Sequence, residues 1–578
     1  MIHDGVRVGR DSEFPLQMGF ASNSRRLALM KTIKRRDFIR IGMLSGVALA
    51  TGCNRHPQSS VSGASNPVPA AGSFELDEKT IAELQEAMKS GSLTARAIAE
   101  KYLSRIAAID KQGPRLNSVI ELNPDALAIA DALDAERKTK GARGPLHGVP
   151  VLIKDNIDTA GRMSTTAGSL ALEGSIAQRD AFIVQRLHEA GAIILGKTNL
   201  SEWANFRSTH STSGWSGRGG LTRNPYALDR NACGSSSGSG AAVSANLCSV
   251  AIGTETDGSI VCPSTTNGIV GIKPTLGLVS RSGIIPISHS QDTAGPMART
   301  VTDAAILLGV IAGVDSRDAV TQESSGKSFT DYTRFLDPNG LRGARIGVAR
   351  KYFGFSNEVD RLMNDAIEVM KRSGATIIDP VDLAQSKEYE DSELEVLLYE
   401  FKHDLNKYLS ELGPKAPFHS LKEIIEFNEK NRDREMPYFA QELFLKAEAK
   451  GPLTSPDYLK ALENNHRLSR TQGIDAVIAK DRLDAIVAPT GGPSWTTDLV
   501  NGDHFTGGSS TPAAVAGYPA ISVPAGFIQG LPVGVSVFGA AYSEPTLIKL
   551  AYAYEQATRH RRAPGFLPTL SLQARAQN

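Results

Sequence analysis

Apolar residues recur along this chain in two alternating patterns. Apolar positions three or four apart indicate an amphipathic helix, whereas a short continuous apolar run between turn residues indicates a buried strand. The helical pattern covers 80–89, 94–109, 124–138, 182–190, 239–246, 301–312, 358–372 and 545–557. The strand pattern covers 149–153, 192–195, 249–252, 344–349, 376–378, 485–488, 520–523 and 533–538.

This alternation of strands and helices predicts the fold class. Apolar strands that alternate with helices are typical of a sheet with helices on both faces. We therefore expect an α/β protein, a single large α/β/α layered domain with a central mixed sheet covered by helices. The domain is predicted to span 74–570, with the polar, helix-rich stretch 383–480 as an insertion and 571–578 as a tail.

Residues 1–53 have the pattern of an export signal rather than of a folded segment. The twin arginines Arg35 and Arg36 precede an uncharged stretch, 41–50. This stretch is much shorter than the roughly 20 residues that a membrane-spanning helix needs. We expect export by the twin-arginine route to the periplasm. Met30 is an alternative start, because the residues before it would form an unusually long polar tail.

Two processing sites compete at the end of this signal. Residues 48–50 fit an ordinary cleavage site, which would release a soluble protein. Residues 49–53 resemble a lipobox that would make Cys53 a lipid anchor, although Ala50 stands where leucine is usual. The Ser/Pro-rich stretch 54–73 suits a linker in either case.

Composition excludes some functions. Lys and Arg total 63 against 62 Asp and Glu, a net charge of +1, so no nucleic-acid surface is indicated. Beside Cys53 there are Cys233, Cys248 and Cys262. An odd number without paired spacing argues against a disulfide scaffold. Twin-arginine substrates are generally exported already folded, so we expect these thiols to be reduced when the core forms. No Cys/His cluster has zinc spacing, so the sequence indicates no zinc site.

Two Gly/Ser-rich segments, 233–240 and 254–260, lie on either side of an Ala-rich helix and a strand. Glycine beside serine permits sharp turns, and the N–H groups of such a turn can stabilise an oxyanion. Residues 234–238 also match Gly-x-Ser-x-Gly. That nucleophile elbow requires a buried strand directly before it, and the polar, proline-containing stretch 223–232 stands there instead. We reject the elbow for this reason.

Lys154 follows the apolar run 149–153. A free lysine has a pKa near ~10.4 and is a poor base at neutral pH. Burial would lower this pKa, and a neutral amine could then take a proton from a serine. On these residues alone, a lysine that extends from the strand end to solvent is the simpler interpretation.

The ordered motifs of the chain resemble the amidase signature enzymes. The matching segments are 144–150, 196–199, the two Gly/Ser-rich segments, 268–274, 292–296, 488–490, 517–526 and 531–534. Residues 320–480 are unlike the common pattern. The resemblance implies hydrolysis of an amide, without metal or cofactor.

The resemblance also implies a Ser–cis-Ser–Lys triad. Ser259 would be the nucleophile, Ser235 the bridging serine on a cis peptide bond, and Lys154 the base. The oxyanion hole would consist of the backbone N–H groups of Thr256, Asp257, Gly258 and Ser259.

Two departures from the family pattern bear on the substrate. Asp257 stands where glycine is usual, and we expect its carboxylate to turn outward and bond locally; Val261 replaces a common arginine. With 282–292, the chain is most similar to bacterial peptide amidases, which release ammonia from C-terminally amidated peptides. Candidate substrate-binding residues are Trp203, Asn205, Phe206 and Arg207.

Other functions remain open at this point. One is an amidase of small aliphatic, aromatic or fatty amides. Another is the glutamine amidohydrolase component of a tRNA-dependent amidotransferase, which the export signal disfavours because that assembly works in the cytosol. A non-enzymatic scaffold is disfavoured by the presence of the complete triad. We expect a monomer whose partner is a small-molecule or peptide amide, not a nucleic acid, and whose only membrane contact would be the lipid anchor.

Overall fold

The computed structural model describes residues 74–384, 386–414 and 416–571. The export signal with Cys53, the linker 54–73 and residues 572–578 lie outside these residues, so the expectations for them stay predictions. Within the described residues, no helix combines the length and the apolar character that a membrane span requires.

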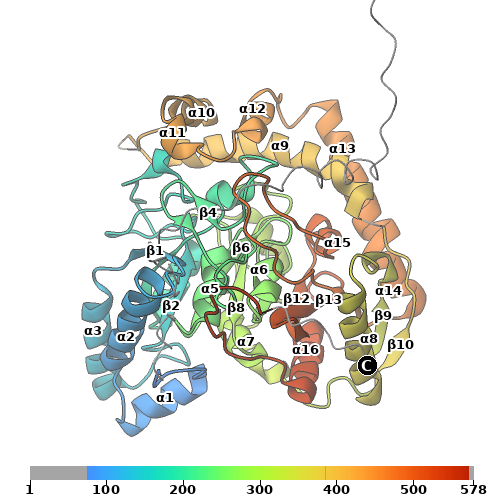
Figure 1. The fold of residues 1–578 in the computed structure, drawn as a ribbon, viewed down its shortest axis with the longest axis horizontal. Coiled ribbons are helices and arrows are strands. Elements are labelled where there is room, and N and C mark those ends of the chain that lie inside the picture. Colours follow the sequence, from blue (N-terminus) through green and yellow to red (C-terminus); the bar gives the residue numbers. More distant parts are fainter. Residues whose placement is uncertain (1–73, 385, 415, 572–578) are drawn as a thin grey trace, which may run out of the picture. The chain divides into compact units, whose positions relative to one another are not determined.

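A mixed sheet of eleven strands forms the centre of the described chain (Figure 1). Its order is β1-β3-β2-β6-β8-β7-β12-β13-β11-β9-β10. The strands are β1 (Val119–Leu122), β2 (Pro150–Lys154), β3 (Ile193–Thr198), β6 (Val250–Glu255), β7 (Val270–Lys273), β8 (Thr293–Ala298), β9 (Arg345–Val348), β10 (Thr376–Ile378), β11 (Ala485–Pro489), β12 (Ala520–Ile528) and β13 (Leu531–Phe538). Strand β2 is parallel to β3 and β6, and β6 is antiparallel to β8. The predicted α/β fold with a mixed sheet is therefore confirmed.

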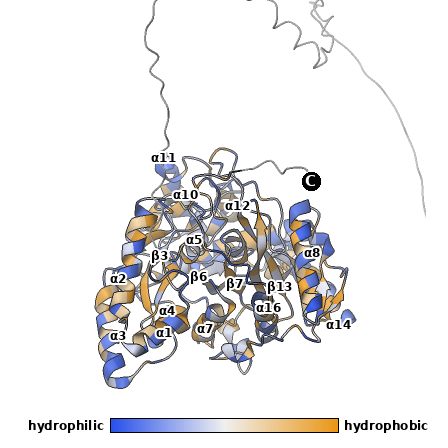
Figure 2. Ribbon diagram, turned by 60° about the horizontal axis from the view of Figure 1, so that its bottom comes forward, coloured by the Kyte–Doolittle hydropathy of each residue, from blue (hydrophilic) through white to orange (hydrophobic). Residues whose placement is uncertain are grey.

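Helices cover this sheet. They are α1 (Ile81–Ser90), α2 (Ala95–Arg105), α3 (Ala126–Lys140), α4 (Phe182–Glu189), α5 (Ser237–Ser244), α6 (Val261–Thr266), α7 (Val301–Ile311), α8 (Asn357–Arg372), α15 (Thr511–Ala516) and α16 (Glu544–Thr558). Every residue of β2, β3, β6 and β8 is buried, as strands covered on both faces must be. Figure 2 shows the apolar strands inside and hydrophilic residues on outer helices such as α8.

A further group of helices follows β10. These are α9 (Ser386–Glu411), α10 (Leu421–Lys430), α11 (Arg432–Glu435), α12 (Glu442–Glu448), α13 (Pro456–His466) and α14 (Asp475–Asp481). In Figure 1, α9 to α13 form a layer along one side of the sheet. Their apolar residues form a core with segment 200–206, in which Phe401 and Phe444 stack at 5.2 Å between ring centroids. This second core fixes the helical layer beside the Gly/Ser-rich segments.

Several elements were missed by the periodicity analysis, among them β8 and α6. Strand β8 contains glycine and proline, both of which weaken a strand prediction, and α6 is a six-residue helix with an internal proline. In the fold, β8 pairs with β6 and β7, so tertiary pairing outweighs local propensity.

Candidate active site

Lys154 is the last residue of β2, and its side chain is fully buried. Its Nζ donates to Ser235 Oγ at 2.7 Å, to Thr254 Oγ1 at 2.8 Å and to the Thr254 carbonyl at 3.2 Å. Burial lowers the pKa of Lys154 to about 7, and the weaker attraction of the Asp292 and Glu255 carboxylates acts in the opposite direction. A large part of this amine is therefore neutral at pH 7, and a neutral amine can accept a proton from the adjacent hydroxyl.

Ser235 lies in the loop that leads into α5. The peptide bond between Gly234 and Ser235 is cis, and the Ser235 side chain is almost fully buried. The N–H of the next residue, Ser236, donates to the carbonyl of Ser259 at 3.2 Å. The two Gly/Ser-rich segments therefore lie side by side, although 24 residues separate the two serines in the sequence.

Ser259 ends a tight turn between β6 and α6. Glu255 stabilises this turn, because its Oε2 accepts from the N–H groups of Ile260 at 2.7 Å and Val261 at 3.0 Å. Gly258 has a φ of +79°, which a residue with a side chain rarely adopts. Within the described residues, the N–H groups of 257–259 donate to no protein acceptor. The turn thus leaves donors beside the Ser259 hydroxyl, as an anion-binding site requires.

The comparison with known families gives the family of this chain. The Amidase family model matches residues 97–548. The chain belongs to the amidase family. The resemblance found in the sequence is thereby confirmed, and the protein is an amide-hydrolysing enzyme.

Relatives of this amidase come from several kingdoms. It is 43% identical over 516 residues to a probable amidase of Arabidopsis thaliana, covering 87% of this chain and 95% of the relative. It is 34% identical over 519 residues to a glutamyl-tRNA(Gln) amidotransferase component of Halorhodospira halophila, covering 85% and 99%. The structure of native peptide amidase from Stenotrophomonas maltophilia is 52% identical, with a TM-score of 0.81 and coverage of 86% and 100%.

Asp257 differs from the expectation that its carboxylate bonds locally. Its Oδ2 accepts from the Thr511 hydroxyl of α15 at 2.8 Å, 254 residues away in the sequence. Burial raises the pKa of Asp257, and burial together with the Asp257 charge raises the pKa of Glu393, on α9, well above its usual range. Two neighbouring buried carboxyl groups cannot both ionise freely. Asp257 and Glu393 together therefore retain a proton that two separate, solvent-exposed carboxyl groups would lose.

The predicted substrate-binding residues of this amidase lie largely among buried contacts. Trp203 packs edge-on against Phe444 at 5.7 Å, and Phe206 lies 5.0 Å from the Phe401 ring. Such contacts attach the helical layer to the sheet domain. A role in substrate binding stays a prediction for both residues.

The other two predicted residues make polar contacts. Arg207 is fully buried; its Nε lies 2.7 Å from Glu202 Oε1, and its Nη1 donates to the carbonyls of Phe439 and Ala440, each at 3.0 Å. Asn205 Oδ1 accepts from the Ser211 hydroxyl at 2.7 Å. Their roles in substrate binding likewise stay predictions.

A cavity of about 410 Å³ lies next to the partners of Lys154. Asn156, Thr254, Thr256 and Asp292 are among its lining residues, together with the apolar stretch 284–287 and charged groups of 281–318 and of α9. The Asn156 amide donates to Thr254 Oγ1 at 3.0 Å, and the Thr256 hydroxyl donates to Asp292 Oδ1 at 2.6 Å. Sequence reasoning gave Thr256 a role only through its backbone N–H. It gave the other three residues none, although Thr254 and Asp292 lie in motifs that carried the resemblance.

The expectation that the cysteines do not pair in a disulfide is wrong for two of them. Cys233 and Cys262 form a disulfide, with their Cα atoms 6.1 Å apart, whereas Cys248 is buried and free. Sequence spacing could not predict this bond, since it depends on the two Gly/Ser-rich segments folding against each other. The disulfide links those segments next to both serines.

Proposed function

We propose that this amidase hydrolyses the C-terminal carboxamide of peptides and releases ammonia. The observation that carries the chemistry is the 2.7 Å hydrogen bond between the buried Lys154 amine and the Ser235 hydroxyl. The substrate class is supported by the 52% identity to a peptide amidase over 86% of this chain and by the peptide-amidase-like segment 282–292.

In the proposed reaction, neutral Lys154 accepts a proton from Ser235, which takes one from Ser259. The Ser259 oxygen attacks the carboxamide carbon, and the N–H groups of 256–259 stabilise the resulting oxyanion. Ser235 then returns a proton to the amide nitrogen, the C–N bond breaks, and ammonia leaves. Water, deprotonated by the same relay, attacks the ester on Ser259 and releases the peptide acid.

Ammonia release from a panel of amides tests the proposal. The panel contains an N-acetylated dipeptide amide, glutamine, and simple aliphatic, aromatic and fatty amides. We expect kcat/KM to be highest for the dipeptide amide. A higher value for glutamine would favour the amidotransferase function of the Halorhodospira relative, and a higher value for a simple amide would favour the small-amide alternative; either result rejects the peptide preference.

The Ser259→Ala variant tests the nucleophile separately from the substrate class. It should lose turnover on every amide in the panel. The matched control is Ser410→Ala, because within the described residues the side chain of this exposed serine on α9 bonds only to a carbonyl of its own helix, that of Lys407 at 2.7 Å. The control should retain full activity. Ammonia release by Ser259→Ala would reject the nucleophile assignment.

We also propose that the enzyme is a monomer exported by the twin-arginine route to the periplasm, with or without a lipid on Cys53. The Arg35–Arg36 pattern supports export. The disulfide Cys233–Cys262 suits an oxidising compartment. Mass spectrometry of the mature N-terminus tests the route, and light scattering of the released protein tests the monomer.

A further inference from the structure

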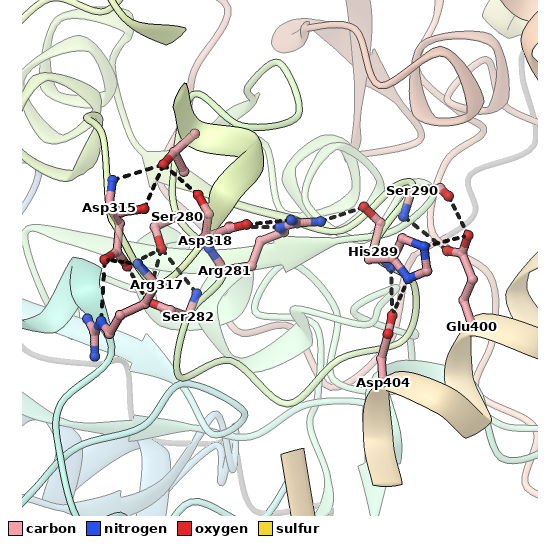
Figure 3. Close-up of polar contacts among 11 residues, drawn as sticks. Ser280, Arg281, Ser282, His289, Ser290, Asp315, Arg317, Asp318, Glu400 and Asp404 are labelled. Carbon is pink, nitrogen blue, oxygen red and sulfur yellow. Dashed lines mark hydrogen bonds and ion pairs between the residues drawn. The ribbon is translucent and has the colours of Figure 1, made fainter. Parts of the chain in front are cut away.

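Three potential metal ligands meet at the rim of the cavity. His289 comes from the loop before β8, whereas His403 and Asp404 are neighbours on α9. Asp404 Oδ2 lies 2.8 Å from His289 Nδ1, and Asp404 Oδ1 lies 2.8 Å from His403 Nδ1. One ligand atom from each of the three side chains lies within 4.8 Å of the others. Figure 3 shows His289 and Asp404 directed toward each other.

We propose that His289, His403 and Asp404 form a binding site for one Zn²⁺ ion. Zinc binds both imidazole nitrogen and carboxylate oxygen, whereas hard cations such as Mg²⁺ prefer oxygen donors alone, so the two histidines favour zinc. Zinc sites with three protein ligands are common. Ligand atoms about 2.1 Å from one ion stand about 3.4 Å from each other in a tetrahedron. The spacing of these three atoms is close enough for small side-chain rotations to produce that arrangement.

A buried carboxylate also contacts His289, at the ring nitrogen that does not face Asp404. His289 Nε2 lies 3.2 Å from Glu400 Oε1, so the imidazole stands between Glu400 on one side and Asp404 on the other. Glu400 is fully buried, and it also accepts from the hydroxyls of Tyr458 at 2.7 Å and Ser288 at 2.5 Å. A carboxylate on the remote nitrogen of a metal-binding histidine fixes its tautomer and orientation, and it is the usual second partner of such a ligand.

The charges around the three ligands also suit a cation. Asp404 and Glu400 supply two carboxylates. Arg281 is a partly buried cation that donates through Nη1 to the His289 carbonyl. Its charge is matched by Asp318, which it contacts through Nε at 2.9 Å and through Nη2 at 2.6 Å. Lys407, one turn along α9, lines the same cavity, but its side chain is exposed to solvent.

An ion at this position would connect α9 to the loop that ends at Asp292. That loop contacts the turn 256–259, because Asp292 accepts from the Thr256 hydroxyl. The expected role is therefore structural: zinc would hold the helical layer against the cavity wall. The spacing rule that predicted no metal could not reveal this site, since 115 residues separate His289 from Asp404.

Calorimetric titration of the metal-free, untagged enzyme with ZnCl₂ at pH 7.5 tests the site. The test variant is His403→Ala. This side chain is exposed, and within the described residues its polar contact is with Asp404, so the fold should persist. The control is His419→Ala, another exposed histidine of the helical layer.

We expect one zinc per chain, affinity at least tenfold weaker in His403→Ala, and no change in His419→Ala. MgCl₂ should give no heat, since magnesium prefers oxygen donors. Zinc should also raise the Tm of the wild type and of His419→Ala, but not that of His403→Ala. Equal zinc affinity in the two variants, or no zinc binding by the wild type at 100-fold excess, would overturn the proposal.

Discussion

The pH dependence of catalysis depends on the protonation of Lys154. The pKa of about 7, in place of 10.5, corresponds to about 5 kcal/mol in favour of the neutral amine. At pH 7 about half of the Lys154 side chains are then neutral, against about one in three thousand for a free lysine. Burial in this site therefore increases the concentration of the base by about a thousandfold.

The direction of the pH effect follows from which form is active. Only the neutral amine can accept a proton, so activity should be lost as the pH falls through about 7 and should be constant above about 8. The assay is kcat/KM for ammonia release from an N-acetylated dipeptide amide between pH 5 and 10. This substrate has no group that titrates in the range, so the curve reports the enzyme.

Lys154→Met provides the comparison. It should be severely impaired near neutral pH, with residual activity rising only where hydroxide replaces the missing base. Thermal unfolding of the variant checks that the fold is intact. A wild-type profile that is flat from pH 5 to 9, or one that rises only near pH 10, would refute the assignment of Lys154 as a base with a lowered pKa.

Three further predictions concern buried polar groups. Arg207→Met should lower the free energy of unfolding by about 3–5 kcal/mol in urea, because it removes the buried ion pair with Glu202 and the donor to two backbone carbonyls; a loss below about 1 kcal/mol would contradict this. Replacing both Cys233 and Cys262 by serine should lower the free energy of unfolding by about 3–4 kcal/mol, because the disulfide closes a loop of 29 residues. It should also lower kcat, because the disulfide lies next to both serines of the site. Unchanged stability and rate would show that the disulfide is dispensable. Cys248, whose pKa burial raises to about 12, should resist alkylation at pH 8 until the protein unfolds, as peptide mapping can show.

The central part of the site could be predicted from the sequence because its signals are local. The apolar run before Lys154 places this residue at a strand end, and the Gly/Ser-rich segments around Ser235 and Ser259 indicate tight turns. The family resemblance then supplied their proposed roles. The alternation of apolar runs and helical periodicity was likewise enough for the fold class.

The contacts between distant segments could not be predicted in this way. Strand β8 is recognisable only by its pairing with β6 and β7. The disulfide and the Asp257–Thr511 bond each join loops whose approach no single segment encodes. Glu393 belongs to the part of the chain that is unlike the family pattern, so no motif could place it near the turn 256–259.

The position of α9 has a consequence for the evolution of this enzyme. The helix contributes Tyr408 to the cavity wall, and its Glu393 accepts at 2.9 Å from Gln291, whose amide also donates to the Thr256 carbonyl at 3.3 Å. Selection that alters α9 would therefore change the cavity wall and, through Glu393 and Gln291, the surroundings of Thr256 at the same time.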